Sequence, residues 1–176
     1  TEIVGTIVVD PLDDRYLIYA IDPDTLPTNT LEPVDSVINP QLTGPNSGLP
    51  GPTPNKRYLL VEDISPDTSA WGLIIGSVTG ISSNPENMTV TSAVPGGKYM
   101  IATVGTTNYI ALGASDNVVG TIFVLNNVTP DGTGTVYKIE DAEANDIIQY
   151  NTDLGVWFVA FDSSEFLDEV QYVLNL

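Results

Sequence analysis

The chain has 176 residues, of which 42% are hydrophobic, and 23 acidic residues against five basic ones give it a formal charge of −18. This charge disfavours nucleic acid and anionic membranes as partners, because phosphate recognition needs clustered lysine and arginine side chains. The absence of cysteine and histidine excludes thiol chemistry, histidine-dependent nucleophilic catalysis and the common zinc sites. No apolar run approaches the ~18 residues of a membrane-spanning helix, and we expect no signal peptide at the N-terminus.

Residues 1–22 are expected to form a β-hairpin. The stretches 6–9 and 15–21 are rich in β-branched and aromatic residues, which favour strands. The intervening Asp10-Pro11-Leu12-Asp13-Asp14 is typical of a turn, because proline restricts φ and aspartate can bond its own backbone.

Residues 23–54 are predicted to be an extended proline-rich arm or linker. Eight prolines fall in this segment, and proline removes the backbone donors that helices and inner strands need. The segment also carries apolar residues that a solvated spacer would not need: Leu26, Leu31, Val34, Val37, Ile38, Leu42 and Leu49. They could cover a neighbouring subunit or pack on the arm's own domain. We predict that the arm lies outside the main core and contacts another chain.

Residues 55–176 are expected to form a β domain of short strands. The expected strands are 57–61, 73–78, 88–91, 98–104, 108–112, 118–125, 134–139, 146–150, 156–161 and 171–176. Gly96-Gly97 and Asp131-Gly132 are tight-turn dipeptides, and helical signal is confined to 140–145 and 163–170. This spacing predicts an all-β fold, a sandwich or barrel-like antiparallel domain.

A series of glycine, threonine and aromatic blocks lies between Gly96 and Val136. In order, the blocks are Tyr99-Met100-Ile101, Gly105-Thr106-Thr107, Gly113-Ala114-Ser115-Asp116-Asn117, Gly120-Thr121-Ile122-Phe123 and Thr133-Gly134-Thr135-Val136. Their order resembles a recurrent β-module of tailed-bacteriophage structural proteins. The alternation of Tyr99, Ile101 and Thr103 suits one face of a sheet, and the glycines permit turns with positive φ.

A second pattern is divided between two distant stretches. The first is Arg57-Tyr58-Leu59-Leu60-Val61 with Trp71-Gly72, and the second is Ala144-Asn145-Asp146-Ile147-Ile148-Gln149-Tyr150-Asn151 with Trp157-Phe158-Val159. They resemble the two halves of a small phage tail or fibre module, in which the halves lie close together. Here about seventy residues separate them, so we predict an inserted β-subdomain at about 76–142. Whether the halves still pair is left open.

These resemblances suggest T4-like or cyanophage relatives and imply a non-enzymatic structural or assembly protein of a tailed-phage virion. Such a protein would be a tail, fibre, neck or decoration component, carried in the extracellular particle after assembly in the host cytoplasm. Its expected partners are other virion proteins and copies of itself. The alternative is a receptor- or glycan-binding adhesin module on a fibre. No catalytic, cofactor-binding or metal-binding residue is predicted.

Carboxylates and aromatic residues are the remaining candidates for chemistry. Turns such as Asp10–Asp14, Asp22-Pro23-Asp24 and the group Glu140, Asp141, Glu143 and Asp146 could supply oxygens to calcium, but their spacing matches no calcium motif. We therefore interpret them as solvated turn carboxylates. A carboxylate pair could also serve a glycosidase, yet 23 acids make some pair inevitable. Trp71, Trp157, Tyr58 and Tyr150 could stack on sugars, but we favour a core role, because each aromatic ring buries ~150–250 Å².

Overall fold

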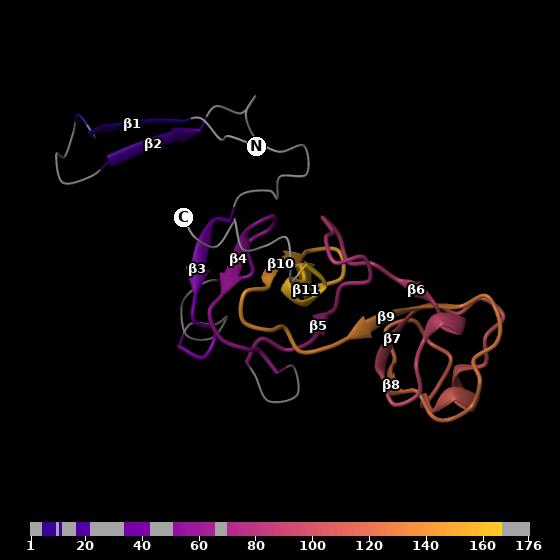
Figure 1. Ribbon diagram of the computed structural model, residues 1–176. Coiled ribbons are helices and arrows are strands. Elements are labelled where there is room, and N and C mark those ends of the chain that lie inside the picture. The colour runs from indigo at the N-terminus through magenta and orange to yellow at the C-terminus, as the bar shows by residue number, and fades with distance from the viewer. Residues whose placement is uncertain are drawn as a thin grey trace. The chain divides into compact units, whose positions relative to one another are not determined.

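The computed structural model describes residues 5–9, 11, 17–21, 34–42, 51–65 and 70–166. The chain divides into two compact units, Thr1–Pro33 and Val34–Leu176. In the first unit, β1 (Gly5–Val9) and β2 (Leu17–Ile21) form an antiparallel hairpin at the place that the sequence predicted (Figure 1). The aspartates at 10, 13, 14, 22 and 24 and the expected strand 171–176 lie outside the described residues.

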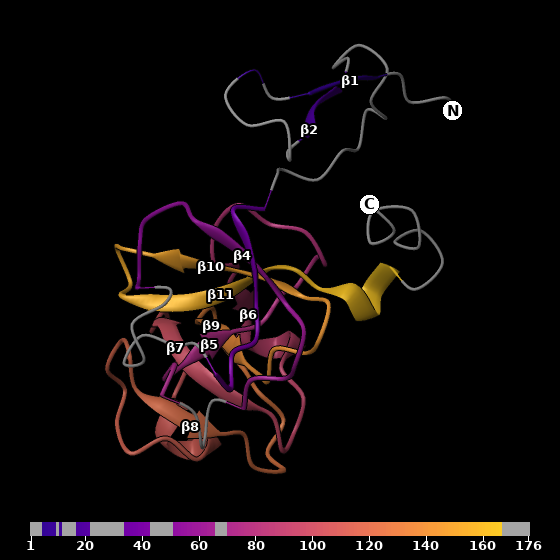
Figure 2. The same cartoon turned by 90° about the vertical axis from the view of Figure 1, so that its left-hand side faces the viewer.

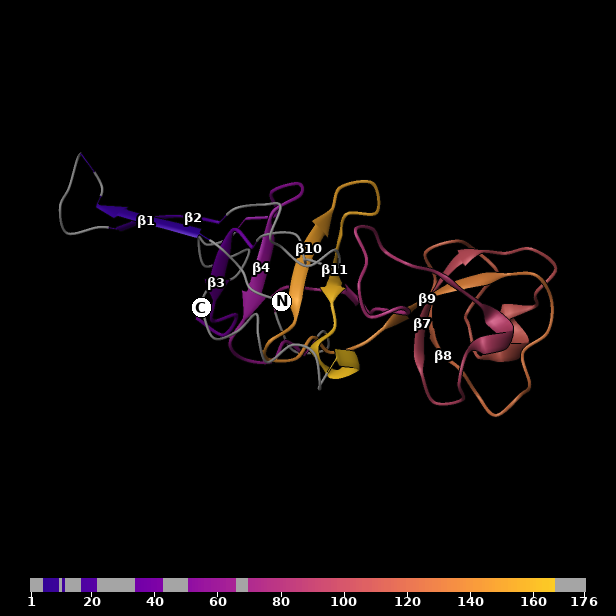
Figure 3. The same cartoon turned by 45° about the horizontal axis from the view of Figure 1, so that its top comes forward.

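The second unit contains one mixed sheet, in which the strand order is β3-β4-β10-β11-β5-β9-β7-β8 and β6 also pairs with β9 (Figures 1 and 3). The strands are β3 (Ser36–Ile38), β4 (Arg57–Leu60), β5 (Ile74–Ile75), β6 (Met88–Thr89), β7 (Lys98–Thr103), β8 (Ile122–Val124), β9 (Thr135–Ile139), β10 (Ile147–Asn151) and β11 (Val156–Phe161). In the described residues, helical structure consists of the short 3₁₀ helices η2 (Val90–Ser92), η3 (Tyr109–Leu112) and η4 (Ser163–Phe166). The all-β prediction is therefore confirmed.

Two strand pairings differ from the antiparallel arrangement that the sequence predicted. β3 lies parallel to β4, and β5 lies parallel to β11. A parallel pair cannot be closed by a tight turn, and in both pairs a long stretch of chain separates the two strands. Hydrophobic alternation reports which residues share a face of a strand, but it does not report the strand's direction.

Some expected elements also have other bounds or other structure. The stretch expected as the strand 108–112 is η3, and the expected strand 118–125 is reduced to β8. The candidate helix 163–170 has its described part in η4, and 140–145 forms a bridge and a turn. Within 140–145, Asn145 has a φ of 78°, a left-handed conformation that does not continue a helix.

Part of the predicted arm belongs to the domain. Ser36, Val37 and Ile38 form β3 and pair with Tyr58, Leu59 and Leu60 of β4. Ile38 is buried in the core. The prediction that the whole segment 23–54 lies outside the core is thus wrong for β3, and the compact unit begins at Val34 instead of near residue 55. The sequence prediction failed here because a proline prevents pairing only locally, and the three proline-free residues of β3 suffice to form an edge strand beside β4.

The hydrophobic interior of the second unit consists of three clusters. The module core contains Ile38, Tyr58, Leu60, Ile64, Trp71, Ile74, Ala142, Ile148, Trp157 and Val159. The insert core contains Val90, Ala93, Tyr99, Ile101, Tyr109, Leu112, Ala114, Phe123, Leu125 and Val136. A bridging cluster of Ile75, Met100, Ile139, Phe158 and Ala160 connects β5, β7, β9 and β11. The predicted insert at about 76–142 therefore supplies a cluster of its own within the same compact unit.

Candidate functional site

The two separated halves of the second sequence pattern come together in space. β10 pairs antiparallel with β4, so that Ile147 lies opposite Leu59 and Ile148 opposite Tyr58. On its other side, β10 pairs antiparallel with β11, which follows it through a short turn (Figure 1). The question that the sequence left open is therefore answered: β4, β10 and β11 form one three-stranded region across the intervening residues.

Three aromatic residues of these halves surround Trp157. The ring centroid of Trp157 lies 4.9 Å from that of Trp71, 5.3 Å from that of Tyr150 and 6.0 Å from that of Tyr58. The Trp71 and Tyr150 contacts are edge-on, the arrangement that aromatic quadrupoles favour. The indole Nε1–H of Trp71 donates a hydrogen bond of 3.1 Å to the Pro40 carbonyl, which ties the segment after β3 to this cluster.

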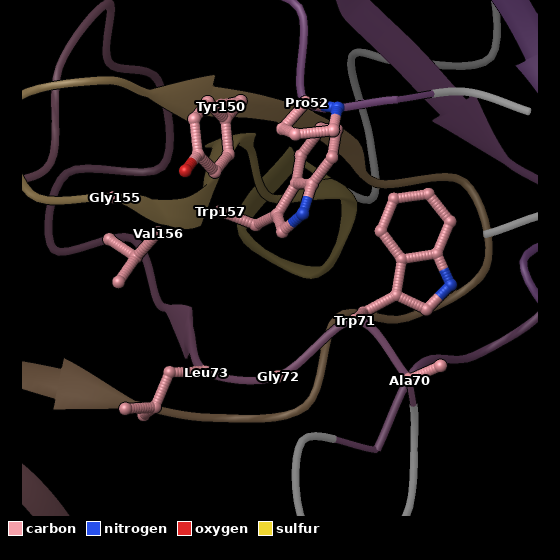
Figure 4. A pocket seen from close by; sticks show the side chains of 9 residues that line it. All are labelled: Pro52, Ala70, Trp71, Gly72, Leu73, Tyr150, Gly155, Val156 and Trp157. Carbon is pink, nitrogen blue, oxygen red and sulfur yellow. The ribbon is translucent and has the colours of Figure 1, made fainter. Parts of the chain in front are cut away.

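A shallow pocket lies over the aromatic cluster (Figure 4). Its volume is about 420 Å³, and its lining residues are Pro52, Ala70, Trp71, Gly72, Leu73, Tyr150, Gly155, Val156 and Trp157. Most of the side chains that line the pocket are apolar, and Tyr150 contributes a hydroxyl group (Figure 4). Trp71 and Trp157 are only 5% and 3% exposed, so most of each indole surface is covered by protein. The two tryptophans therefore belong to the core, as the sequence predicted. Tyr150 is half-buried and is more accessible than either tryptophan.

The glycine and threonine blocks of the first sequence pattern form a clasp, which we define as residues 105–107 and 132–134. The Thr106 N–H donates to Thr133 Oγ1 at 3.2 Å, and the Thr133 N–H donates to Thr106 Oγ1 at 3.1 Å. The Gly134 N–H donates to Thr107 Oγ1 at 3.0 Å. These bonds hold the turn after β7 against the turn before β9. The blocks thus have a structural role in joining two strands.

Glycine is required in this clasp because the backbones approach closely. A Cβ on Gly134 would lie 2.3 Å from the Tyr109 hydroxyl and 2.8 Å from the Val104 carbonyl oxygen. Tyr109 is fully buried. Its hydroxyl is placed to donate a hydrogen bond to the Thr103 carbonyl oxygen at 2.9 Å or to the Thr135 carbonyl oxygen at 3.0 Å. Burial raises the pKa of the Tyr109 phenol. The Tyr109 hydroxyl is therefore a structural donor inside the insert core.

The Gly-Ala-x-x-Asn block organises η3. The side-chain oxygen of Asn117 accepts hydrogen bonds from the backbone N–H groups of Tyr109 at 2.6 Å and Ile110 at 3.3 Å. These are N–H groups in the first turn of the helix, which has no earlier carbonyls to use. Gly113 ends the helix with a φ of 111°, and Ala114 is buried in the insert core. Gly113, Ala114 and Asn117, the residues that the block specifies, therefore all support the local fold.

Asp146 is the one buried carboxylate in the predicted acidic group, and it too is used structurally. One oxygen accepts from the Glu143 N–H at 2.8 Å, and the other accepts from the Ser163 N–H at 2.8 Å and from the Ser163 hydroxyl at 2.9 Å. Burial raises the pKa of the Asp146 carboxyl, and these hydrogen bonds act in the opposite direction. Asp146 thus connects the start of β10 to η4. The prediction of a solvated turn carboxylate is wrong for this residue.

The other acids of the group are distributed differently. Glu140 forms an ion pair with Lys138, and burial raises the pKa of Glu140 although the lysine opposes the shift. Asp141 and Glu143 are exposed. Among the residues that the structure describes, no group of three or more acidic side chains is placed to hold a metal ion. The prediction of no metal site stays a prediction for the whole chain.

Two exposed apolar residues of β8 were not singled out in the sequence. Ile122 and Val124 stand on the sheet face opposite Phe123, which is buried in the insert core. The alternation Ile122-Phe123-Val124 is uniformly apolar, so hydrophobicity alone could not show which residues face solvent. The signal available in the sequence was the low density of charge around this strand.

Searches against protein-family models, curated proteins and solved structures give no significant match for this chain. Within the described ranges, no helix has the length and hydropathy needed to cross a bilayer.

Proposed function

We propose that this chain is a non-enzymatic structural or assembly component of a tailed-bacteriophage virion. The observation that carries the proposal is the reunion of the two halves of the tail or fibre module pattern. β4 pairs with β10, although the two strands are far apart in the sequence, and β10 pairs with β11. The ring centroid of Trp71 in the first half lies 4.9 Å from that of Trp157 in the second. The resemblance on which the proposal rests thus involves residues that form one physical unit.

The roles of the motif residues support the same proposal. The Gly-Thr-Thr and Thr-Gly-Thr blocks form the clasp, Asn117 caps η3, and the aromatic residues form the module core. These motif side chains are used in packing and in turn hydrogen bonds. Motif residues that build the scaffold leave the surface of the protein available for assembly contacts.

The proposal is tested by quantitative mass spectrometry of purified particles. Particles of a phage that encodes this chain are purified by density gradient, and peptides of the chain are quantified against those of the major capsid protein. We expect a fixed stoichiometry across preparations, while a non-structural protein of the same phage, followed as a control, should be lost on purification. Finding the chain only in infected-cell lysate and never in particles would contradict the proposal.

An enzymatic function is tested separately with the purified chain. Polysaccharide from the host surface is incubated with the protein, and released reducing ends are measured over time. We expect no release above the buffer control. Hydrolysis that disappears when a single carboxylate pair is changed to amides would overturn the non-enzymatic part of the proposal.

The pocket over the aromatic cluster supports a second candidate, a receptor- or glycan-binding adhesin module. Its accessible ring is Tyr150, which a sugar could stack against. A glycan array with the wild-type chain and the Tyr150→Ala variant tests this candidate, with Leu154→Ala as a control on the neighbouring exposed turn. Binding that is lost in Tyr150→Ala and kept in Leu154→Ala would favour the adhesin, and an array without signal would count against it.

A further inference from the structure

The turn before β9 contains the dipeptide Asp131-Gly132. The chain has one Asp-Gly dipeptide and no Asn-Gly dipeptide. Asp131 is exposed and Gly132 is half-buried, and both precede β9, which begins at Thr135. Gly132 belongs to the clasp, in the part of the second unit around β7 and β8 in Figure 2. Solvent therefore reaches the Asp131 side chain directly beside the clasp.

The carboxyl group of Asp131 faces the backbone amide of the next residue. The Gly132 N–H donates a hydrogen bond of 2.6 Å to Asp131 Oδ1. The amide nitrogen therefore lies beside the carboxyl carbon, Cγ, to which Oδ1 is bonded. A bond between this nitrogen and Cγ would close a five-membered ring, and glycine has no side chain to obstruct the nitrogen. Intramolecular reactions are accelerated when the reacting atoms are already held close together.

Three other aspartates of the second unit direct their carboxylates at groups other than their own next amide. Their backbone donors lie two or more residues away in the sequence: Val118 for Asp116, Ser163 for Asp146 and Ser164 for Asp162. After each of the three, the next residue also carries a side chain, which shields its amide nitrogen. We use these three residues as the control aspartates.

We propose that Asp131 is a site of spontaneous backbone isomerisation to isoaspartate. The Gly132 nitrogen attacks Cγ of the protonated Asp131 carboxyl group, a C–N bond forms, and the carboxyl hydroxyl leaves with the amide proton as water. Water then opens the resulting succinimide. Breaking the new N–Cγ bond restores aspartate, whereas breaking the bond from the nitrogen to the original main-chain carbonyl gives isoaspartate. Water released in the first step is taken up in the second, so no other reactant is needed.

Isomerisation lengthens the main chain by one carbon directly beside the clasp. Gly132 packs tightly there, since a Cβ at this position would lie 2.5 Å from Thr107 Oγ1. The Thr133 N–H donates to Thr106 Oγ1 at 3.1 Å, and the Gly134 N–H donates to Thr107 Oγ1 at 3.0 Å. An added main-chain carbon displaces these donors from their acceptors. The isoaspartate form should therefore have a looser clasp.

The experiment incubates the purified full chain at near-neutral pH and physiological temperature for several weeks. Peptide mapping by mass spectrometry with electron-transfer dissociation distinguishes isoaspartate from aspartate at each position. We expect isoaspartate to accumulate at Asp131, while the control aspartates stay unchanged. The isoaspartate form is then separated by chromatography, and its clasp amides should exchange hydrogen faster than those of the unmodified chain, because exchange reports local opening.

Two variants test the chemistry. Asp131→Glu should abolish the isomerisation signal, because attack by the Gly132 nitrogen would have to close a six-membered ring. Asp131→Asn should accumulate isoaspartate faster than the wild type, because its side-chain amide forms the same succinimide with release of ammonia. Far-UV circular dichroism verifies that both variants are folded.

The outcome does not depend on the virion proposal, because the reaction needs only this chain and water. A wild type that forms no isoaspartate at Asp131, or as much at the control aspartates, would overturn the proposal. Unchanged hydrogen exchange in the clasp of the isoaspartate form would overturn its structural consequence.

Discussion

Truncation of Trp157 to alanine should strongly destabilise the second unit. The side chain is 3% exposed, and its ring contacts three other aromatic rings at centroid distances of 4.9, 5.3 and 6.0 Å. Replacement of a buried tryptophan by alanine costs about 3–5 kcal/mol through lost burial and the remaining cavity. Aromatic pairs contribute roughly 0.5–1.5 kcal/mol each beyond burial, which places Trp157→Ala in the upper part of that range.

This loss is measured by urea unfolding followed by far-UV circular dichroism and by tryptophan fluorescence. The chain has two tryptophans, and both belong to the module core, so the emission of the remaining Trp71 reports that cluster specifically. Since a loss of 1 kcal/mol lowers the melting temperature by roughly 2–4 °C at this chain length, a loss of about 4–5 kcal/mol should lower it by about 8–20 °C.

Leu154→Ala is the matched control, because Leu154 lies in the turn between β10 and β11 and is 41% exposed. It should change the free energy of unfolding by less than about 0.5 kcal/mol. If Trp157→Ala cost less than 1 kcal/mol, or no more than the control, the argument that the two halves of the module share one core around Trp157 would be refuted.

Three further substitutions test the clasp, the β3 connection and the buried carboxylate. Gly134→Ala should cost about 1–3 kcal/mol by overpacking, whereas Gly51→Ala, where an added Cβ meets open space, should be close to neutral in the same thermal-unfolding series. The ion pair with Lys56 lowers the pKa of Asp35, so the stability advantage of wild type over Asp35→Asn should be present above pH 3.8 and should disappear as pH falls through the folded-state pKa, as followed by urea unfolding at successive pH values. Asp146→Asn should cost about 1–3 kcal/mol even though it removes a buried charge, because the amide turns a donor toward backbone N–H groups; an equally stable variant in chemical denaturation would contradict the assigned hydrogen bonds.

Several features of this protein follow from the amino-acid sequence by itself. β-Branched residues, aromatic residues and turn dipeptides predicted an all-β chain with most strands near their observed positions, including the N-terminal hairpin. These signals are local: a side-chain period of two and a glycine or proline at a turn depend on residues within a few positions. The core role of Trp71 and Trp157 was predicted for a similar reason, because large aromatic rings in a small β domain contribute much of its buried area.

The tertiary structure alone decided which strands are neighbours and which polar groups are buried. Pairing of Ile148 with Tyr58 and the parallel placement of β3 beside β4 depend on packing between residues far apart in the chain, which strand periodicity does not encode. The same holds for Asp146, whose partner Ser163 is brought close by η4. The exposure of Ile122 and Val124 became visible only when Phe123 was seen to face inward, because three consecutive apolar residues show no alternation until one face is covered by a core.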